Sequence, residues 1–432
     1  MTAVAIPFLT EADPDRMGEG SLDPLGLASI ADRLAEAIAP EITARMNRIR
    51  FLTLITAGAS VAAELGDEIS ADGRTPAYLA YEWIVVESLA RRCAPGETEG
   101  VPGIQKARRA IARSKNAHLD AGAYLQVPKV FGFHGVYKRL ARAVGFVDQG
   151  LLALSEGDAL LRIWEREQGL RGFADRVPRT RGGKLATRLL GEVQRALAAG
   201  SVTTGPGSWL WSEIADAAGP DKAGRRERDH IWRALTSEDE PIRRELILNL
   251  QSISDGRELS EAGALREIAS LSSLGLRDRL TAIDRYERFA WLLTAVFQTM
   301  LVRSTSQGRR AILPDEFSDV DLIARASREL PEASRQAADA VAAVGEELAF
   351  EAAFARFAEP HRPDQLVDAA LEHHEAVQVA KEKRPWIERV EPGFAARPPY
   401  YTSDEPPIEG EYIHPYRVEA ISSFIRDLGK TR

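Results

Sequence analysis

The sequence predicts an all-α protein with many helices arranged in two or three domains. Apolar residues recur at i, i+3, i+4 and i+7 from about residue 22 onward, and alternation of apolar and polar residues over five or more positions is hard to find. The residues between the apolar positions are mainly Ala, Leu, Arg and Glu, which are good helix formers. A chain of 432 residues is long enough for two or three domains of about 100 to 200 residues each.

The predicted helices are separated by polar breaks that are rich in Gly or Pro. Two helix starts carry the spacing of a capping box, Ser155 with Asp158 and Ser237 with Glu240. Between residues 384 and 417, prolines and aromatic residues replace the helical pattern, which indicates an extended segment. We expect one helix that begins at residue 156, and others at 22–39, 41–65, 78–92, 104–115, 135–144, 184–199, 206–217, 222–235, 238–253, 273–304, 331–358, 363–383 and 418–429.

The breaks with most Gly and Pro suggest the domain boundaries. We expect an N-terminal helical domain at 1–100 and a basic, helix-turn-helix-like region at 101–200. A C-terminal helical domain at 201–385 and a tail at 386–432, which is rich in Pro and aromatic residues and ends in a helix, complete the chain.

The composition excludes several kinds of protein. Cys93 is the only cysteine, so there is no intramolecular disulfide and no cysteine-based zinc site. The N-terminus lacks the basic start and long apolar stretch of a signal peptide. The longest apolar runs, 51–63 and 289–302, are shorter than the roughly 20 residues that cross a bilayer. We therefore expect a cytoplasmic protein with no membrane partner.

The charge is distributed unevenly along the chain. The formal net charge is −8, but residues 101–190 carry a net charge of about +10, which leaves about −18 for the rest. Binding of a phosphate backbone requires several cations on one surface. The basic segment therefore favours a nucleic-acid partner despite the acidic average.

The stretch FGFHGVYKRLARAVGFVDQGLLALSEGDALL, residues 131–161, carries the most specific pattern. Its helix at 135–144 has a basic face with Lys138, Arg139 and Arg142, opposite an apolar face. The apolar positions are Val136, Tyr137, Leu140 and Val144. A glycine corner, the phrase with Leu154, Ser155 and Gly157, and a second helix follow. This order resembles the latter half of a winged helix-turn-helix, which implies contact between the basic helix and DNA.

The resemblance implies a wider set of nucleic-acid-binding residues. Lys129 and His134 lie just before the basic helix, where they are expected to touch backbone phosphate. Basic residues in the flanking segments extend the surface: Lys106, Arg109, Arg113, Arg179, Arg181 and Lys184. The segment DQGLLAL is too short for a wing of normal size. A helix corner with a solvated basic face is the alternative interpretation.

Two further phrases carry a wider resemblance. DPLGLASIADRLAEAIAP at 23–40 and HHEAVQVAKEKRPWIE at 373–388 resemble segments of large uncharacterised bacterial proteins from anti-phage defence gene clusters. The resemblance spans most of the chain, although neither phrase is a mechanistic motif. It implies a non-catalytic subunit of a defence or DNA-modification system.

The sequence gives little support for a catalytic or metal site. His373 and His374 are adjacent, so they point apart on a helix and do not share a face as H-x-x-x-H ligands do. The acids of 315–321 lack the strands and nearby lysine of a Mg²⁺ nuclease, and the helix dipole explains them more simply. Cys93 has no nearby histidine, and Gly-Gly-Lys at 182–184 is a weak phosphate signal. We expect no metal ion and no cofactor.

These observations predict a non-catalytic nucleic-acid-binding subunit of a bacterial DNA-acting complex, with DNA and other protein subunits as partners. One alternative is a helical adaptor or scaffold whose basic surface meets an acidic protein. Another is an enzyme of unrecognised type, whose polar groups converge only in the fold. The aromatic tail is expected either to dock on the protein's own surface or to recognise a partner subunit.

Overall fold

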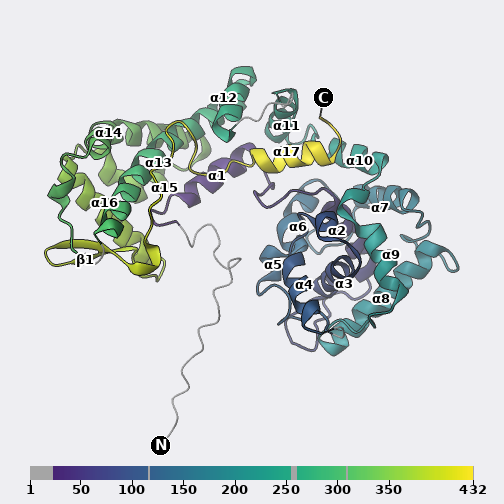
Figure 1. Cartoon of the computed structure of the whole chain (residues 1–432). Coiled ribbons are helices and arrows are strands. Elements are labelled where there is room, and N and C mark those ends of the chain that lie inside the picture. The colour runs from purple at the N-terminus through teal and green to yellow at the C-terminus, as the bar shows by residue number, and fades with distance from the viewer. Residues whose placement is uncertain (1–22, 115–116, 254–259, 308–309, 432) are drawn as a thin grey trace, which may run out of the picture. The chain divides into compact units, whose positions relative to one another are not determined.

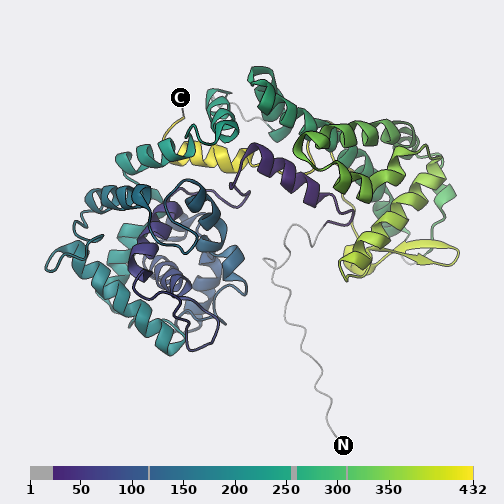
Figure 2. The same cartoon turned by 180° about the vertical axis from the view of Figure 1, so that it is seen from behind.

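The structure, a computed structural model, describes residues 23–114, 117–253, 260–307 and 310–431 (Figures 1 and 2). These ranges contain seventeen α-helices and one sheet of two strands. The predicted all-α class is therefore confirmed. None of the helices described is long and apolar enough to cross a membrane.

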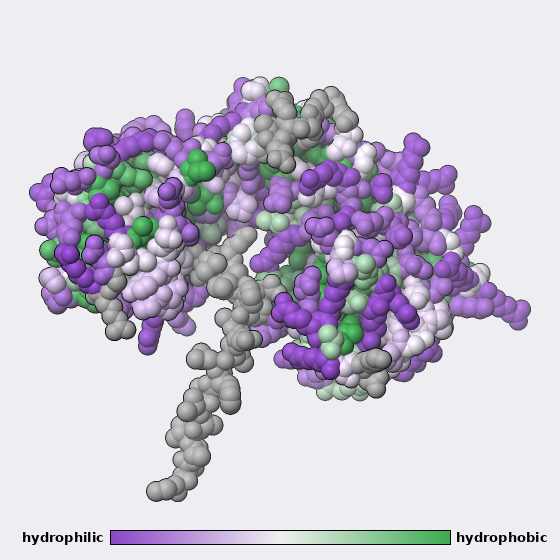
Figure 3. All heavy atoms as spheres, in the orientation of Figure 1, coloured by the Kyte–Doolittle hydropathy of each residue, from purple (hydrophilic) through white to green (hydrophobic). Residues whose placement is uncertain are grey.

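The chain forms two compact units, each built from two separate stretches of sequence. Unit 1 combines Met1–Ile38 with Glu258–Tyr416, and unit 2 combines Ala39–Arg257 with Arg417–Arg432. This grouping differs from boundaries at residues 100, 200 and 385, because helices on both sides of residues 100 and 200 pack around the same central helix. On the face drawn in Figure 3, both units are mainly hydrophilic, with apolar residues in small separate areas.

Unit 2 is arranged around the helix α3 (Ala77–Arg92), which contacts five other helices. Figure 1 shows these helices around α3. Most of α3 is buried, including Trp83 on one side and Leu89 on another, as expected for a helix that is apolar on more than one face. The other helices are α2 (Arg50–Ala62), α4 (Ile104–Arg113), α5 (Pro128–Phe131), α6 (Phe133–Ala143), α7 (Ser155–Glu167), α8 (Arg181–Ala199), α9 (Trp209–Ala218), α10 (Arg225–Leu235), α11 (Pro241–Ile253) and α17 (Val418–Asp427).

Unit 1 is built on α13 (Leu274–Ser306), a helix of 33 residues. Its apolar half meets a cluster of aromatic rings, in which the Phe289 ring lies 5.0 Å from Phe350 and 5.1 Å from Phe354. The Tyr286 hydroxyl donates a 2.6 Å hydrogen bond to the carbonyl of Leu27, just before α1. The remaining elements are α1 (Ala28–Ile38), α12 (Glu261–Leu271), α14 (Asp321–Val341), α15 (Glu347–Phe354), α16 (Pro363–Ala380), β1 (Ile387–Val390) and β2 (Gly393–Ala396).

The Pro-rich and aromatic segment is folded onto unit 1. Strands β1 and β2 form an antiparallel hairpin in which Ile387 pairs with Ala396. Further along, the Trp291 indole on α13 donates a 2.9 Å hydrogen bond to the carbonyl of Pro407. The Tyr416 hydroxyl donates a 2.6 Å bond to the buried Glu287 carboxylate. Of the two interpretations of this segment, docking on the protein's own surface matches these contacts.

Several predicted element boundaries are wrong in detail. Helix α2 begins at Arg50 and not near residue 41, and α14 begins ten residues before the predicted 331. Helix α12 was not expected from the sequence. Ser155 is the first residue of α7, and neither predicted capping box forms: the N-cap of α7 is Leu154, and the Ser237 hydroxyl bonds to Asp239. Tertiary packing overrides such local signals.

Candidate functional site

The basic helix of the sequence is α6, held in unit 2 by its apolar face. Val136, Tyr137, Leu140 and Val144 are all buried, as the sequence predicts. The rings of Phe133 and Tyr137 lie 5.4 Å and 5.2 Å from that of Phe51 on α2. The short helix α5 lies so close to α6 that a Cβ at Gly135 would come within 2.6 Å of the Val130 backbone. Glycine at this position therefore allows α5 and α6 to present their outer faces together.

Three of the predicted cations gather on α5 and α6. Lys138 is half-buried, and its pKa is lowered by burial and then by the nearby charges of Arg142 and Lys129. Lys138 and Arg142 lie one turn apart on α6, and a Cβ at Gly135, in the turn before Lys138, would come within 2.7 Å of the Lys129 backbone. We call these three residues the α5–α6 cluster. No described residue forms an ion pair with Lys129 or Lys138. Their charges are therefore available to an anionic ligand.

Two further residues border this cluster. The Arg45 guanidinium lies 4.3 Å from the centroid of the Phe131 ring, at the end of α5. On α3, Tyr78 is half-buried. Burial and then the charge of Glu82 raise the pKa of its hydroxyl, and the charge of Arg142 opposes this shift. Cations beside an aromatic ring are a common composition of nucleic-acid-binding surfaces. No sequence pattern selects Arg45 or Tyr78, because both lie outside the basic segment.

His134 has a structural position and cannot contact a phosphate as predicted. Its ring is 1% exposed, and both its Nδ1 and its backbone N–H lie 2.9 Å from Oε2 of Glu82. The same buried carboxylate accepts a 2.9 Å hydrogen bond from the Tyr124 hydroxyl. Glu82 therefore joins the start of α6 to α3, and the histidine fixes the position of the basic helix.

Arg139 and Arg142 do not lie free on one basic face with Lys138. The Arg139 Nε lies 2.6 Å from Oε2 of Glu41, so this guanidinium is paired within the unit. Arg142 donates hydrogen bonds to the carbonyls of Asp148 and Gln149 and remains half-exposed. One side of Arg142 therefore holds the following corner, while its charge still contributes to the cluster.

The corner after α6 is a short hairpin. Val147 and Ala153 form an antiparallel bridge, and the Leu154 N–H donates to the Phe146 carbonyl. Gly157 at the start of α7 lies against that carbonyl, because a Cβ there would come within 2.0 Å of the oxygen. The corner is as small as the sequence predicts, and the winged-helix resemblance stays a prediction.

The other predicted cations lie on different elements. Arg109 and Arg113 are exposed on α4, and Lys106 on the same helix is half-buried. Arg179 is exposed in the loop before α8, where its φ of 70° is left-handed. Lys184 is exposed on α8, and Arg181 pairs with Glu213 of α9 at 2.8 Å. The structure therefore does not gather all the predicted residues into the α5–α6 cluster.

The adjacent histidines His373 and His374 and the cysteine Cys93 lie in structural positions. His374 donates from Nδ1 to the Pro24 carbonyl at 2.8 Å and accepts from the Trp386 N–H at Nε2, while His373 bonds to the Leu25 carbonyl. The described residues contain no group of three or more His, Cys, Asp or Glu side chains placed to hold a metal ion. Burial raises the pKa of the Cys93 thiol, which disfavours the reactive thiolate.

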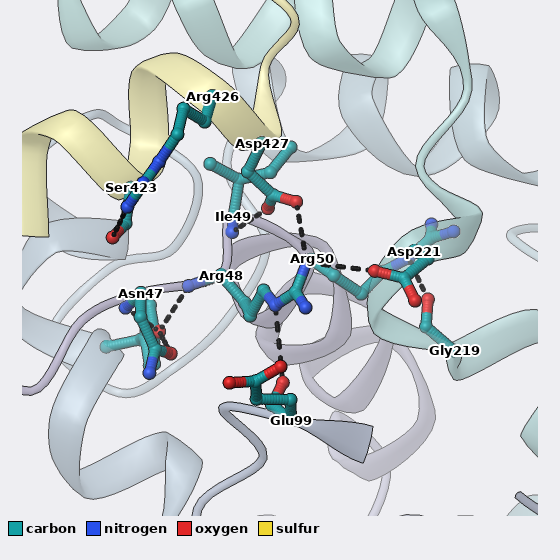
Figure 4. Close-up of polar contacts among 11 residues, drawn as sticks. Asn47, Arg48, Ile49, Arg50, Glu99, Gly219, Asp221, Ser423, Arg426 and Asp427 are labelled. Carbon is teal, nitrogen blue, oxygen red and sulfur yellow. Dashed lines mark hydrogen bonds and ion pairs between the residues drawn. The ribbon is translucent and has the colours of Figure 1, made fainter. Parts of the chain in front are cut away.

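A second polar site, not indicated by the sequence, is a cleft of about 530 Å³ in unit 2. Arg48 lies at its centre, as Figure 4 shows. Its Nη1 is 2.9 Å from Asp221 and 3.3 Å from Asp427, and its Nε donates to the Glu99 carbonyl. The lining residues are Asn47, Arg48, Glu99, Gly100, Asp221, Arg228, Glu419, Ser423, Arg426 and Asp427.

The floor of the cleft includes the segment that leads into α2. The N–H groups of Asn47 and Arg48 donate to the Tyr137 hydroxyl at 2.9 Å and 3.0 Å, and the next N–H, of Ile49, donates to Asp427 at 2.8 Å. Burial raises the pKa of Asp427, although Ile49 and Arg48 oppose the shift. Three consecutive backbone N–H groups before α2 are thereby hydrogen-bonded, so the floor of the cleft is well fixed.

Two arginines in the cleft have unused hydrogen-bond donors. Arg228 of α10 has an enclosed Nε without a hydrogen-bond partner, and no described residue bonds or pairs with its guanidinium. Arg426 of α17 is exposed and donates to the Ser423 hydroxyl at 3.1 Å. These residues come from separate parts of the chain, which is why sequence patterns did not reveal the site.

Comparisons with protein-family models, with curated proteins and with solved structures found no match. The functional conclusions therefore rest on the residues and their geometry.

Proposed function

We propose that the protein binds nucleic acid through the α5–α6 cluster, as a non-catalytic subunit of a bacterial DNA-acting complex. The observation that supports this proposal is the placing of Lys138 and Arg142 one turn apart on α6, beside Lys129 of the adjacent helix α5. Burial, and after it the charges of Arg142 and Lys129, lower the pKa of Lys138. Such a grouping is unfavourable in the free protein and becomes favourable when phosphates lie against it.

The type of contact follows from the side chains. Lysine offers a mobile point charge. Arg142 already donates hydrogen bonds to carbonyl groups of the corner after α6. The cluster is therefore better suited to contact phosphates than to recognise bases. We therefore propose binding with little sequence preference. Arg45 and Tyr78 extend the surface toward the backbone or an unstacked base.

The place of this activity in a larger system is also part of the proposal. The segments at 23–40 and 373–388 resemble proteins of anti-phage defence clusters, which supports assembly with other DNA-acting subunits. In unit 1, the second segment supplies the last eight residues of α16 and the first two of β1.

The test is a titration of the full chain against labelled duplex DNA at 50 mM and 200 mM salt. The variant K129A/K138A/R142A should lose most of its affinity at 50 mM while circular dichroism shows unchanged helical content. A control variant, R92A/R226A/R328A, removes the same charge from exposed positions elsewhere. Equal affinity in the two variants would refute the proposed surface.

A further inference from the structure

The cleft around Arg48 has the features of a small-molecule site that is separate from the α5–α6 cluster. Its volume of about 530 Å³ lies within the range of about 300 to 1,000 Å³ that ligand pockets occupy. All of its lining residues belong to unit 2. Its floor is fixed by Asp427 and Tyr137 through the N–H groups that precede α2.

The charges of the lining are divided between used and unused groups. Arg48 is paired with two carboxylates of the protein, those of Asp221 and Asp427, and the charge of Arg228 also acts on Asp427. Arg228 and Arg426 retain guanidinium donors. An enclosed guanidinium N–H without an acceptor is costly in a folded protein. An anionic group placed between Arg228 and Arg426 would accept a hydrogen bond from this N–H group.

Acidic residues at the rim of the cleft limit the kind of ligand that can carry this anionic group. Glu99 and Glu419 are exposed at the cleft, and no described residue forms an ion pair with either carboxylate. These acids would repel a continuous polyanion such as a DNA strand. They would instead accept hydrogen bonds from hydroxyl groups of a compact ligand.

We propose that this cleft binds a small phosphate monoester that carries hydroxyl groups, the chemistry of sugar phosphates and mononucleotides. The phosphate lies against Arg228 and Arg426, because planar guanidinium groups match phosphate oxygens. The hydroxyl groups of the ligand donate to Glu99 and Glu419. Asn47 and Ser423 supply further polar contacts on the same lining.

The test is isothermal titration calorimetry of the full chain with three probes: ribose 5-phosphate, inorganic phosphate and ribose. Ribose 5-phosphate should bind more tightly than either of the other two. R228A and R426A should each weaken it by about ten- to a hundredfold, as expected for loss of a hydrogen bond to a charged group. R225A is the matched control, because Arg225 lies on the same helix as Arg228 with a side chain that is 94% exposed.

The variants also separate the two parts of the proposal. E419Q and E99Q should weaken ribose 5-phosphate and leave inorganic phosphate unchanged or slightly tighter. If R228A does not fold, R228K and the surface variant R426A still report on the phosphate contact. Absence of ribose 5-phosphate binding at millimolar concentration, equal binding of inorganic phosphate, or unchanged binding in R426A and R228K would overturn the proposal. Duplex DNA binding by R426A should equal that of the unaltered protein, so this site and the α5–α6 cluster can fail independently.

Discussion

Arg50 and Glu227 form an ion pair in the interior of unit 2, with neither side chain exposed. The Nη1 atom of Arg50 lies 2.8 Å and 2.7 Å from the two carboxylate oxygens. The Thr53 hydroxyl donates to the same carboxylate at 2.7 Å, and the Arg50 Nε donates to the Gly219 carbonyl. The pair therefore links α2 to α10 and to the segment just after α9, behind the cleft.

Removal of one partner should destabilise unit 2 strongly. E227A leaves a buried guanidinium without its counter-charge, and such changes cost about 3 to 5 kcal/mol. The double variant R50M/E227L should recover much of this loss, because a well-packed apolar pair often replaces a buried ion pair at little cost. Urea unfolding of the three proteins measures the difference. A double variant as unstable as E227A would contradict this account.

The stability of unit 1 should decrease in mild acid because of His374. Burial lowers the pKa of this ring to about 4, below the ordinary value of about 6.5. The folded state therefore binds fewer protons than the unfolded state between these values, and the free energy of unfolding falls as the pH falls. This group should contribute a loss of about 3 kcal/mol between pH 6.5 and pH 4.

Denaturant unfolding at several pH values, with H374Q and a control variant H361Q, tests this prediction. H374Q should flatten the pH dependence, while H361Q, changed in the loop before α16, should retain it. His373 is also buried, and burial lowers its pKa, so some slope should remain in H374Q. An unchanged slope in H374Q would contradict the assignment.

Replacement of Glu409 by alanine should detach the segment after β2 locally, while the rest of unit 1 stays folded. Arg325 and Arg288 lower the pKa of Glu409 to about 2, yet all three side chains are more than a third exposed. E409A should therefore cost less than about 1 kcal/mol of global stability. Hydrogen exchange should increase at residues 404–412 and remain unchanged in α13. A large global loss would show that this surface network carries more energy than its exposure implies.

The sequence was sufficient to predict the helical class and most helices, because their apolar periodicity is strong. Helix α6 is an example: all four residues of its predicted apolar face are buried. Local patterns could not show that His134 turns inward to Glu82 or that Arg139 reaches Glu41, since both partners are distant in sequence. The cleft could not be predicted for the same reason, because Arg48 and Asp427 are 379 positions apart in the sequence.

The most direct test of the central proposal is the salt dependence of DNA affinity. For each phosphate contact, the logarithm of the binding constant falls with the logarithm of salt concentration by a slope of about 0.9. If Lys129, Lys138 and Arg142 each neutralise one phosphate, the slope of K129A/K138A/R142A should be smaller than that of the unaltered protein by about 2.7. The control R92A/R226A/R328A should retain the original slope. Equal slopes for the unaltered protein and the cluster variant, or no binding by the unaltered protein at 50 mM salt, would contradict binding through this surface.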